Sequence, residues 1–87
     1  MGFRDFINEI KGIEGDRVNI DILHKLYGNQ KMHCDLQVLD DESRLGFHFA
    51  ATNQEIYIEK EKICDFGIKK GVYYFASDLM RIELKTI

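Results

Sequence analysis

The first regular pattern of apolar positions along the chain predicts a helix. Apolar side chains recur at the i, i+3, i+4 and i+7 spacing of one helical face, at Phe3, Phe6, Ile7 and Ile10. Gly12 follows them and can adopt the left-handed conformation that ends a helix. We therefore expect a helix over about residues 2–11. Its apolar face must be covered by another element, because an isolated helix of this length is marginal in water.

From residue 17 the apolar period changes from 3.6 to 2, which is typical of half-buried strands. Alternating runs occupy residues 18–26, 32–38, 45–49, 56–58, 72–76 and 79–84. A helix that begins after Asp16 and ends at Gly28 is an alternative for the first run, since Leu23 and Tyr27 break strict alternation. Residues 59–71 do not follow the alternating pattern, and their sequence is compatible with either a strand or a helical turn.

Burial suggests a register between the predicted strands, because a shift by one residue would move a whole apolar set to the wrong face. A loop of three residues at 28–30 sets Ile22 opposite Leu36, whereas a two-residue loop would set Ile22 opposite Asp35. The longer loop matches burial and also fits a glycine-assisted bulge. Extended across the sheet, this register gives two core rows, Ile22-Leu36-Phe47-Ile58 and His24-Cys34-Phe49-Ile56.

These elements predict a mainly β fold of the α+β class. We expect one N-terminal helix followed by five or six antiparallel strands in a curved sheet or small barrel. The chain forms a single domain over residues 1–87, with the helix at about 2–11 and the sheet at about 17–87. The order of elements is similar to that of Sm-like and SH3-like small barrels, but no family motif accompanies it, so this likeness says little about activity.

Charge and cysteine content narrow the classes of function. Twelve Lys and Arg residues against fifteen Asp and Glu residues give a net charge of −3, which disfavours binding to a phosphate backbone. Cys34 and Cys64 are too few for a disulfide scaffold and lack the paired spacing of structural zinc sites. No secretory signal precedes the helix, and no apolar run approaches the roughly 20 residues of a membrane span. We expect a cytoplasmic protein without membrane contact.

A group of polar side chains is the main candidate site. In the register above, the solvent face of the sheet carries His33, Asp35, His48, Tyr57 and Glu55. Asp35 would lie opposite His48, with their Cβ atoms about 5 Å apart. Two imidazoles and a carboxylate suit transition metals, and a histidine held by an aspartate can act as a general base. Polar residues also occupy any solvated face without function. The sequence therefore predicts a binding site here and assigns no metal, cofactor or catalytic residue to it.

Two other features carry potential chemistry. His24 and Cys34 are predicted neighbours on the core face, where a histidine could activate a thiol. Burial of both as ordinary core residues is favoured, since no third group orients the pair. The chain has no glycine-rich phosphate loop and no G-x-S-x-G nucleophile motif.

The aromatic run Tyr73-Tyr74-Phe75 could stack on nucleic-acid bases. A hairpin at Ser77-Asp78 that pairs Phe75 with Met80, however, turns Tyr73 and Phe75 toward the core. Only Tyr74 then stays exposed, where a cation–π contact with Arg81 is expected.

The leading hypothesis for function is a non-catalytic binding or regulatory module that works through protein–protein contacts and self-associates as a homo-oligomer. An apolar helix and strand edges that must be covered or paired support it. The alternatives are a small barrel that binds nucleic acid, which the net charge disfavours, and a metal-dependent activity at His33, Asp35 and His48.

Overall fold

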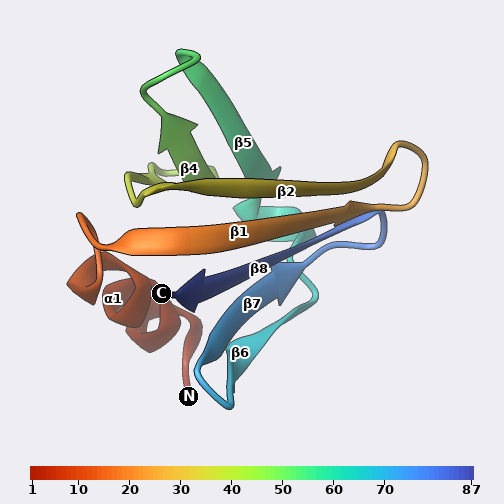
Figure 1. Cartoon of the computed structure of the whole chain (residues 1–87). Coiled ribbons are helices and arrows are strands. Elements are labelled where there is room, and N and C mark those ends of the chain that lie inside the picture. Colours follow the sequence, from red (N-terminus) through yellow and green to blue (C-terminus); the bar gives the residue numbers. More distant parts are fainter.

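The computed structural model describes the whole chain, residues 1–87, as one α-helix, one 3-10 helix and eight strands (Figure 1). The elements are α1 (Phe3–Gly12), β1 (Arg17–His24), β2 (Gly28–Asp35), β3 (Val38–Asp40), β4 (Arg44–Phe49), β5 (Gln54–Glu59), η1 (Lys60–Lys62), β6 (Asp65–Lys69), β7 (Val72–Ala76) and β8 (Met80–Thr86). The predicted class, a mainly β fold with an N-terminal helix and antiparallel strands, is confirmed. α1 is too short to cross a membrane, and no other helix is longer.

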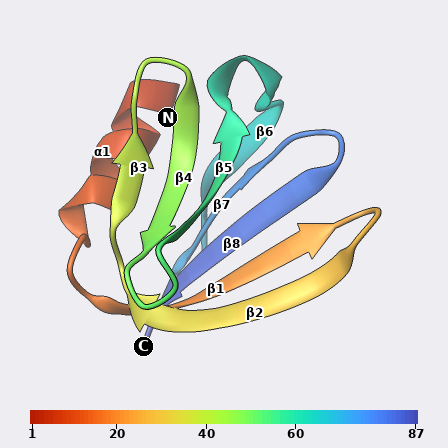
Figure 2. The same ribbon diagram turned by 90° about the horizontal axis from the view of Figure 1, so that it is seen from above.

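The strands form two antiparallel sheets that curve around one core (Figure 2). A five-stranded sheet has the order β2-β1-β8-β7-β6, and a three-stranded sheet has the order β3-β4-β5. Only Leu36 and Gln37 separate β2 from β3, so the chain passes from one sheet to the other within two residues. Pairing continues across this bend, because the amide of His48 donates to the carbonyl of Gln37 over 2.9 Å.

The predicted helix is confirmed, and it packs on its own chain. Phe6, Ile7 and Ile10 are fully buried, and the ring of Phe6 contacts Phe66 and Phe75 at centroid distances of 5.3 and 6.2 Å. Burying an apolar side chain of this size contributes about 1.5–3 kcal/mol. The apolar face of α1 therefore needs no partner molecule to cover it.

The buried side chains are all hydrophobic, and they follow the predicted alternation along the strands. Leu36 and Phe47 lie in the core, as the face assignment requires. Residues 17–24 form a strand, which excludes the helix weighed for this segment. Residues 59–71, left open by the sequence, contain η1 and β6.

The predicted register between the first two strands is wrong by six residues. Ile22 pairs with Gln30 instead of Leu36, and the turn lies at residues 25–27 instead of 28–30. The turn closes early because Nδ1 of His24 accepts hydrogen bonds from the amides of Leu26 and Tyr27, at 3.1 and 3.3 Å. A shift by an even number of residues keeps every side chain on its face, so burial could not reveal the error. His24 accordingly pairs with residues 28 and 80, and the predicted contact with Cys34 does not form.

Three further registers are shifted by two residues, which again keeps every side chain on its face. Phe47 pairs with Val38 instead of Leu36. Phe47 pairs with Ile56 instead of Ile58, because residues 50–53 join β4 to β5, whereas the predicted pairing would need a turn of only two residues, 52–53. Phe75 pairs with Ile82 instead of Met80, because the turn lies one residue later: the amide of Ser77 donates to the carbonyl of Met80, and Ser77 Oγ accepts from the amides of residues 79 and 80.

A largely buried carboxylate ties α1 to the smaller sheet. The side chain of Asp40 is 8% exposed, and Nζ of Lys11 and Nζ of Lys60 each lie 2.6 Å from it, with Arg4 at 3.9 Å. Glu14 adds a second tie, since its carboxylate accepts from the amide of residue 38 over 2.7 Å. Burial alone would raise the pKa of Asp40, but hydrogen bonds and charge from the two lysines overcome it and lower the pKa.

Candidate functional site

The five residues predicted to form one site lie in two separate places. His33 and Asp35 are on β2 in the larger sheet, whereas His48, Tyr57 and Glu55 are on the smaller sheet. The predicted contact between Asp35 and His48 is wrong, because the pairing is shifted by two residues and Gln37 lies opposite His48, beyond the end of β2. Asp35 pairs instead with Arg17 at 3.4 Å, and the side chain of His33 contacts that of Asn19 at 2.7 Å.

The second group surrounds Arg44, which the sequence analysis missed. His48 and Arg44 lie 3.9 and 3.8 Å from the carboxylate of Glu55, and the guanidinium of Arg44 sits 5.0 Å from the ring centre of Tyr57. Arg44 Nε also donates to Asp41 over 2.7 Å, and this hydrogen bond lowers the pKa of Asp41 and raises that of Arg44. The alternation of Arg44 with His48 along β4 was visible in the sequence. This network holds the turn between β3 and β4, and each of its partners is a neighbour on the same small sheet.

No three His, Cys, Asp or Glu side chains converge where a metal ion could be held. The separation of His33 and Asp35 from His48 is the direct cause. Burial raises the pKa of the Cys34 thiol, outweighing the lowering by Arg17, so this thiol is held in its protonated, less nucleophilic form.

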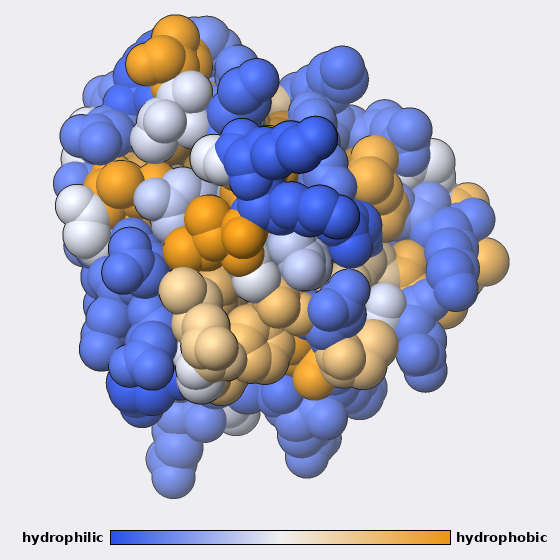
Figure 3. All heavy atoms as spheres, turned by 90° about the horizontal axis from the view of Figure 1, so that it is seen from below, coloured by the Kyte–Doolittle hydropathy of each residue, from blue (hydrophilic) through white to orange (hydrophobic).

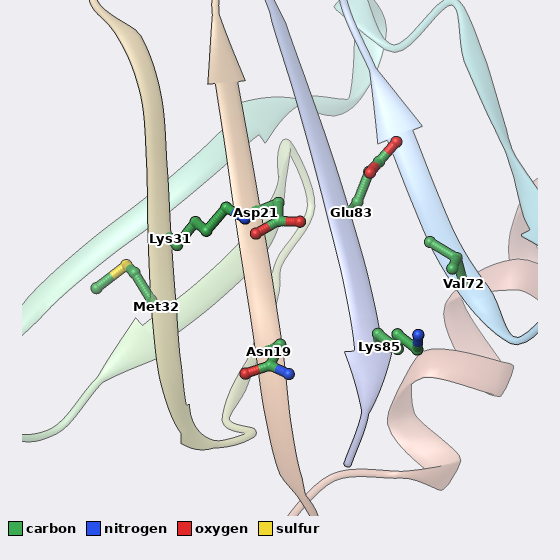
Figure 4. Close-up of a pocket in the computed structure, with 7 residues that line it drawn as sticks. All are labelled: Asn19, Asp21, Lys31, Met32, Val72, Glu83 and Lys85. Carbon is green, nitrogen blue, oxygen red and sulfur yellow. The ribbon is translucent and has the colours of Figure 1, made fainter.

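The outer face of the larger sheet carries a shallow pocket of mixed charge (Figure 4). Asp21 and Glu83 lie directly opposite each other on β1 and β8, and Lys31 extends from β2 toward Asp21 on β1 (Figure 4). Farther along this face, the guanidinium of Arg81 covers the ring of Tyr74 at 4.3 Å, which confirms the predicted cation–π contact. The only aromatic ring expected to stack on bases is therefore already occupied by a neighbour.

A long unpaired strand edge runs along β2. In an antiparallel sheet, successive residues point their backbone groups alternately to one neighbour and to the other. The amide of Leu36 donates to the carbonyl of Asp16, and that of Ile87 donates to the carbonyl of Arg17. Even positions of β1 and β2 therefore bond to each other. The odd positions of β2 direct their N–H and C=O groups away from β1, where the sheet has no further strand. These positions are Asn29, Lys31, His33 and Asp35.

An apolar groove lies beside this edge. It has a volume of about 240 Å³ and separates residues 30–34 of β2 from residues 49–52 at the start of the β4–β5 turn. Met32, on β2, extends on the side away from β1 (Figure 4). A second cavity of about 310 Å³ continues past Asp35 to Gln37 and the same turn. The edge is thus flanked by space lined partly with apolar side chains.

The edges of β3 and β6 are better protected, whereas the edge of β5 is also open. The outer amide of Val38 in β3 is bonded to Glu14, and β6 is only five residues long and packs against α1 through Phe66 and Phe3, 5.1 Å apart. On β5 the ladder bond from residue 60 to residue 43 leaves the odd positions, including Glu55 and Glu59, facing outward. The edge of β2 is eight residues long, has no proline and carries one lysine. Long unpaired edges of this kind are templates for a further strand.

Exposed apolar side chains gather in two other places. Leu26, Tyr27 and Leu79 sit at neighbouring turns, since the amide of Lys25 donates to the carbonyl of Leu79, and Tyr27 is 86% exposed. The face seen from below also has an apolar patch surrounded by hydrophilic residues (Figure 3).

In comparisons with known proteins, no protein-family model, curated protein or solved structure matches the chain.

Proposed function

We propose that the chain is a non-catalytic protein-binding module that self-associates by pairing the free edge of β2 with another strand. The observation that carries this proposal is the row of outward-facing backbone groups at the odd positions of β2, beside an apolar groove. A strand is the ligand that such a row fits best, because it supplies a donor and an acceptor at every second residue. The apolar face of α1 is buried within the chain, so the helix no longer supports self-association. The proposal therefore depends on the edge of β2.

The chemistry of the remaining surface favours a protein partner over nucleic acid or metal. The outer sheet face mixes Asp21 and Glu83 with Lys31 and Lys85, and so gives no continuous positive field for a phosphate backbone. Neither imidazole of the proposed metal site has a second histidine or two carboxylates beside it.

The experiment blocks the edge without disturbing the sheet. The amide of Lys31 points away from β1, so Lys31→Pro removes a donor only from the free edge. The matched control is Glu55→Pro, which removes an outward-facing amide from the free edge of β5.

Sedimentation velocity from roughly 1 μM to 1 mM covers the affinity range of small interfaces. We expect the wild-type protein and Glu55→Pro to gain mass with concentration, and Lys31→Pro to remain a monomer while keeping its circular dichroism spectrum. A wild-type protein that stays monomeric throughout, or a folded Lys31→Pro variant that associates like the wild type, would overturn the proposal.

A further inference from the structure

The free edge of β2 is complementary to itself, and we propose that its partner is β2 of a second copy, antiparallel to it and related by a two-fold axis beside His33. This inference rests on the proposed function and adds which residues meet. It starts from the spacing of charges along the edge. Lys31 and Asp35 lie two residues before and two residues after His33, on the same outer face.

Backbone geometry limits the ways in which two such edges can pair. The outward-facing groups are at odd positions, so each hydrogen-bonded pair must join an odd position of one copy to an odd position of the other. A two-fold axis can satisfy this requirement beside Lys31, Met32, His33 or Cys34. The four arrangements differ in which side chains face each other.

Charge distinguishes three of them. An axis beside Lys31 sets two lysines opposite each other, which is destabilising in a directly opposed pair. An axis beside Met32 sets Lys31 opposite His33 and gives no ion pair. An axis beside His33 sets Lys31 opposite Asp35 of the second copy, and does so twice. The lysine that would otherwise guard the edge against pairing then contributes to it.

The fourth arrangement, with the axis beside Cys34, is limited by the bend of the chain. Because Gln37 lies beyond the bend, this arrangement leaves only the pair of His33 with Asp35 of the second copy and its symmetry mate, whereas the His33-centred register also pairs Lys31 with Asp35 on both sides of a His33 pair. The carbonyl of Gln37 already accepts from the amide of His48 over 2.9 Å, because the chain has begun to pair with β4 at this point. The His33-centred register ends its ladder at Asp35, just before this bend.

The inner side of the edge agrees with the His33-centred register. Met32 comes opposite Cys34 of the second copy at a position that is not hydrogen-bonded, where Cα atoms lie about 4.5 Å apart. Both side chains are half-buried and line the apolar groove. Pairing would therefore withdraw more of their apolar surface from water, which favours association.

The same register gives the exposed turn of the β1–β2 hairpin a place to pack. Asn29 comes opposite Gln37 of the second copy, so Leu26 and Tyr27 extend just beyond it. The cavity lined by Gln37 and Ala50 lies at this end of the edge. Contact there would cover two of the most exposed apolar side chains of the protein.

Disulfide trapping tests the register. All proteins carry Cys64→Ser, which removes the exposed second thiol. Met32→Cys then places a thiol opposite Cys34 of the second copy at a Cα separation compatible with a disulfide. We expect Met32→Cys to give a covalent dimer under mild oxidation, and Met32→Cys with Cys34→Ser to give none. A dimer that persists without Cys34 would indicate an axis beside Met32, and a dimer of the protein with Cys34 alone would indicate an axis beside Cys34; either result overturns the inference.

Charge exchange gives an independent test without oxidation. Lys31→Asp alone sets two pairs of acidic groups against each other, and Asp35→Lys alone sets two pairs of lysines, so each should dimerise about tenfold more weakly or worse. Mixing the two proteins restores both ion pairs and should restore the dimer mass in sedimentation velocity. A mixture that associates no better than its components overturns the inference.

Failure of this inference is distinguishable from failure of the proposed function. Suppose that Lys31→Pro abolishes association but both disulfide trapping and charge exchange fail. β2 would then remain the interface, and the His33-centred pairing would be rejected. A wild-type protein that is monomeric at every concentration would reject both.

Discussion

Removing the charge of Asp40 should destabilise the protein more than any other single change at its polar positions. Its carboxylate is 8% exposed and receives the ammonium groups of Lys11 and Lys60, each at 2.6 Å. Asp40→Asn keeps the shape of the side chain but converts two charge-assisted contacts into neutral ones. It also leaves Lys60, only 18% exposed, without a counter-charge.

The expected magnitude follows from these contacts. A hydrogen bond to a charged group contributes about 1.5–3 kcal/mol, and an exposed ion pair contributes about 0–1 kcal/mol. Lys11 is 44% exposed and can be hydrated again when the charge of Asp40 is removed. The losses at Lys11 and Lys60 therefore do not add in full. We expect a loss of about 2–3 kcal/mol, with most of it at Lys60. In a domain of this size that loss lowers the melting temperature by on the order of 10–20 °C.

The assay is thermal and urea denaturation followed by circular dichroism, with Glu61→Gln as the control. Glu61 is exposed, next to Lys60 in sequence, and makes no ion pair, so its substitution should change stability by less than about 0.5 kcal/mol. A melting temperature of Asp40→Asn within about 2 °C of the wild type would refute the reasoning, because it would mean that the lysines lose nothing when their counter-charge is removed.

Lowering the pH should abolish the same stabilisation. The pKa of Asp40 is lowered in the folded state, so its contribution is complete above the unfolded-state pKa of about 4 and is lost as the pH falls through the folded-state value. The difference in unfolding free energy between the wild type and Asp40→Asn should therefore be constant near neutral pH and shrink below about pH 4. A difference that stays unchanged in strong acid would show that it does not come from this carboxylate.

Two further pairs of substitutions test the packing. Gly46→Ala would place a Cβ 1.9 Å from the carbonyl oxygen of Ile56, so we expect a loss of about 3 kcal/mol or more in urea denaturation. The control is Gly12→Ala, whose Cβ would meet nothing within 4 Å, and it should be neutral or stabilising by up to about 1 kcal/mol. Equal changes in stability for Gly46→Ala and Gly12→Ala would contradict the predicted clash. Phe6→Ala removes a ring with no exposed surface and should cost about 3–5 kcal/mol, clearly more than the same change at the half-buried Phe3.

The faces of the elements could be predicted from the sequence because burial repeats with a local period. Ile7 and Ile10 fall on one side of a helix, and Leu36 and Phe47 fall on the inner side of their strands, whatever the rest of the chain does. This period fixed the helix, the strands and the inward-facing residues. The period could not show that the strand ends at residue 24 and that residues 25–27 form a turn, because Leu26 continues the apolar pattern of the strand.

Register could not be predicted, because the sequence indicates roughly where a turn lies but not which residues its hydrogen bonds join. Nδ1 of His24 closes the β1–β2 turn by accepting from two backbone amides, and Ser77 Oγ does the same before β8. His24 was expected in a strand, and Ser77 was expected in a turn at Ser77-Asp78, but that turn lies one residue later, since the amide of Ser77 donates to the carbonyl of Met80. Even-numbered shifts leave burial unchanged, so only the geometry of these turns decides which residues face each other.

The predicted site does not form as one cluster, but two of its residues lie on the free edge of the larger sheet. His33 and Asp35 were expected beside His48, but the bend at residues 36–37 takes β3 and β4 into a separate sheet. The same two residues now matter as outward-facing positions of an edge strand.

That edge exists because of a single long-range pairing. β8 inserts between β1 and β7, with Ile82 opposite Ile22 and Leu84 opposite Ile20, and this buries all four side chains. Once β1 has β8 on one side and β2 on the other, β2 is the end of the sheet, and its second row of backbone groups can be satisfied only by water or by another strand. No local pattern within residues 28–35 carries this information. An edge strand is defined by which strand is missing beside it, and here the charges of Lys31 and Asp35 suit a second copy of the strand itself.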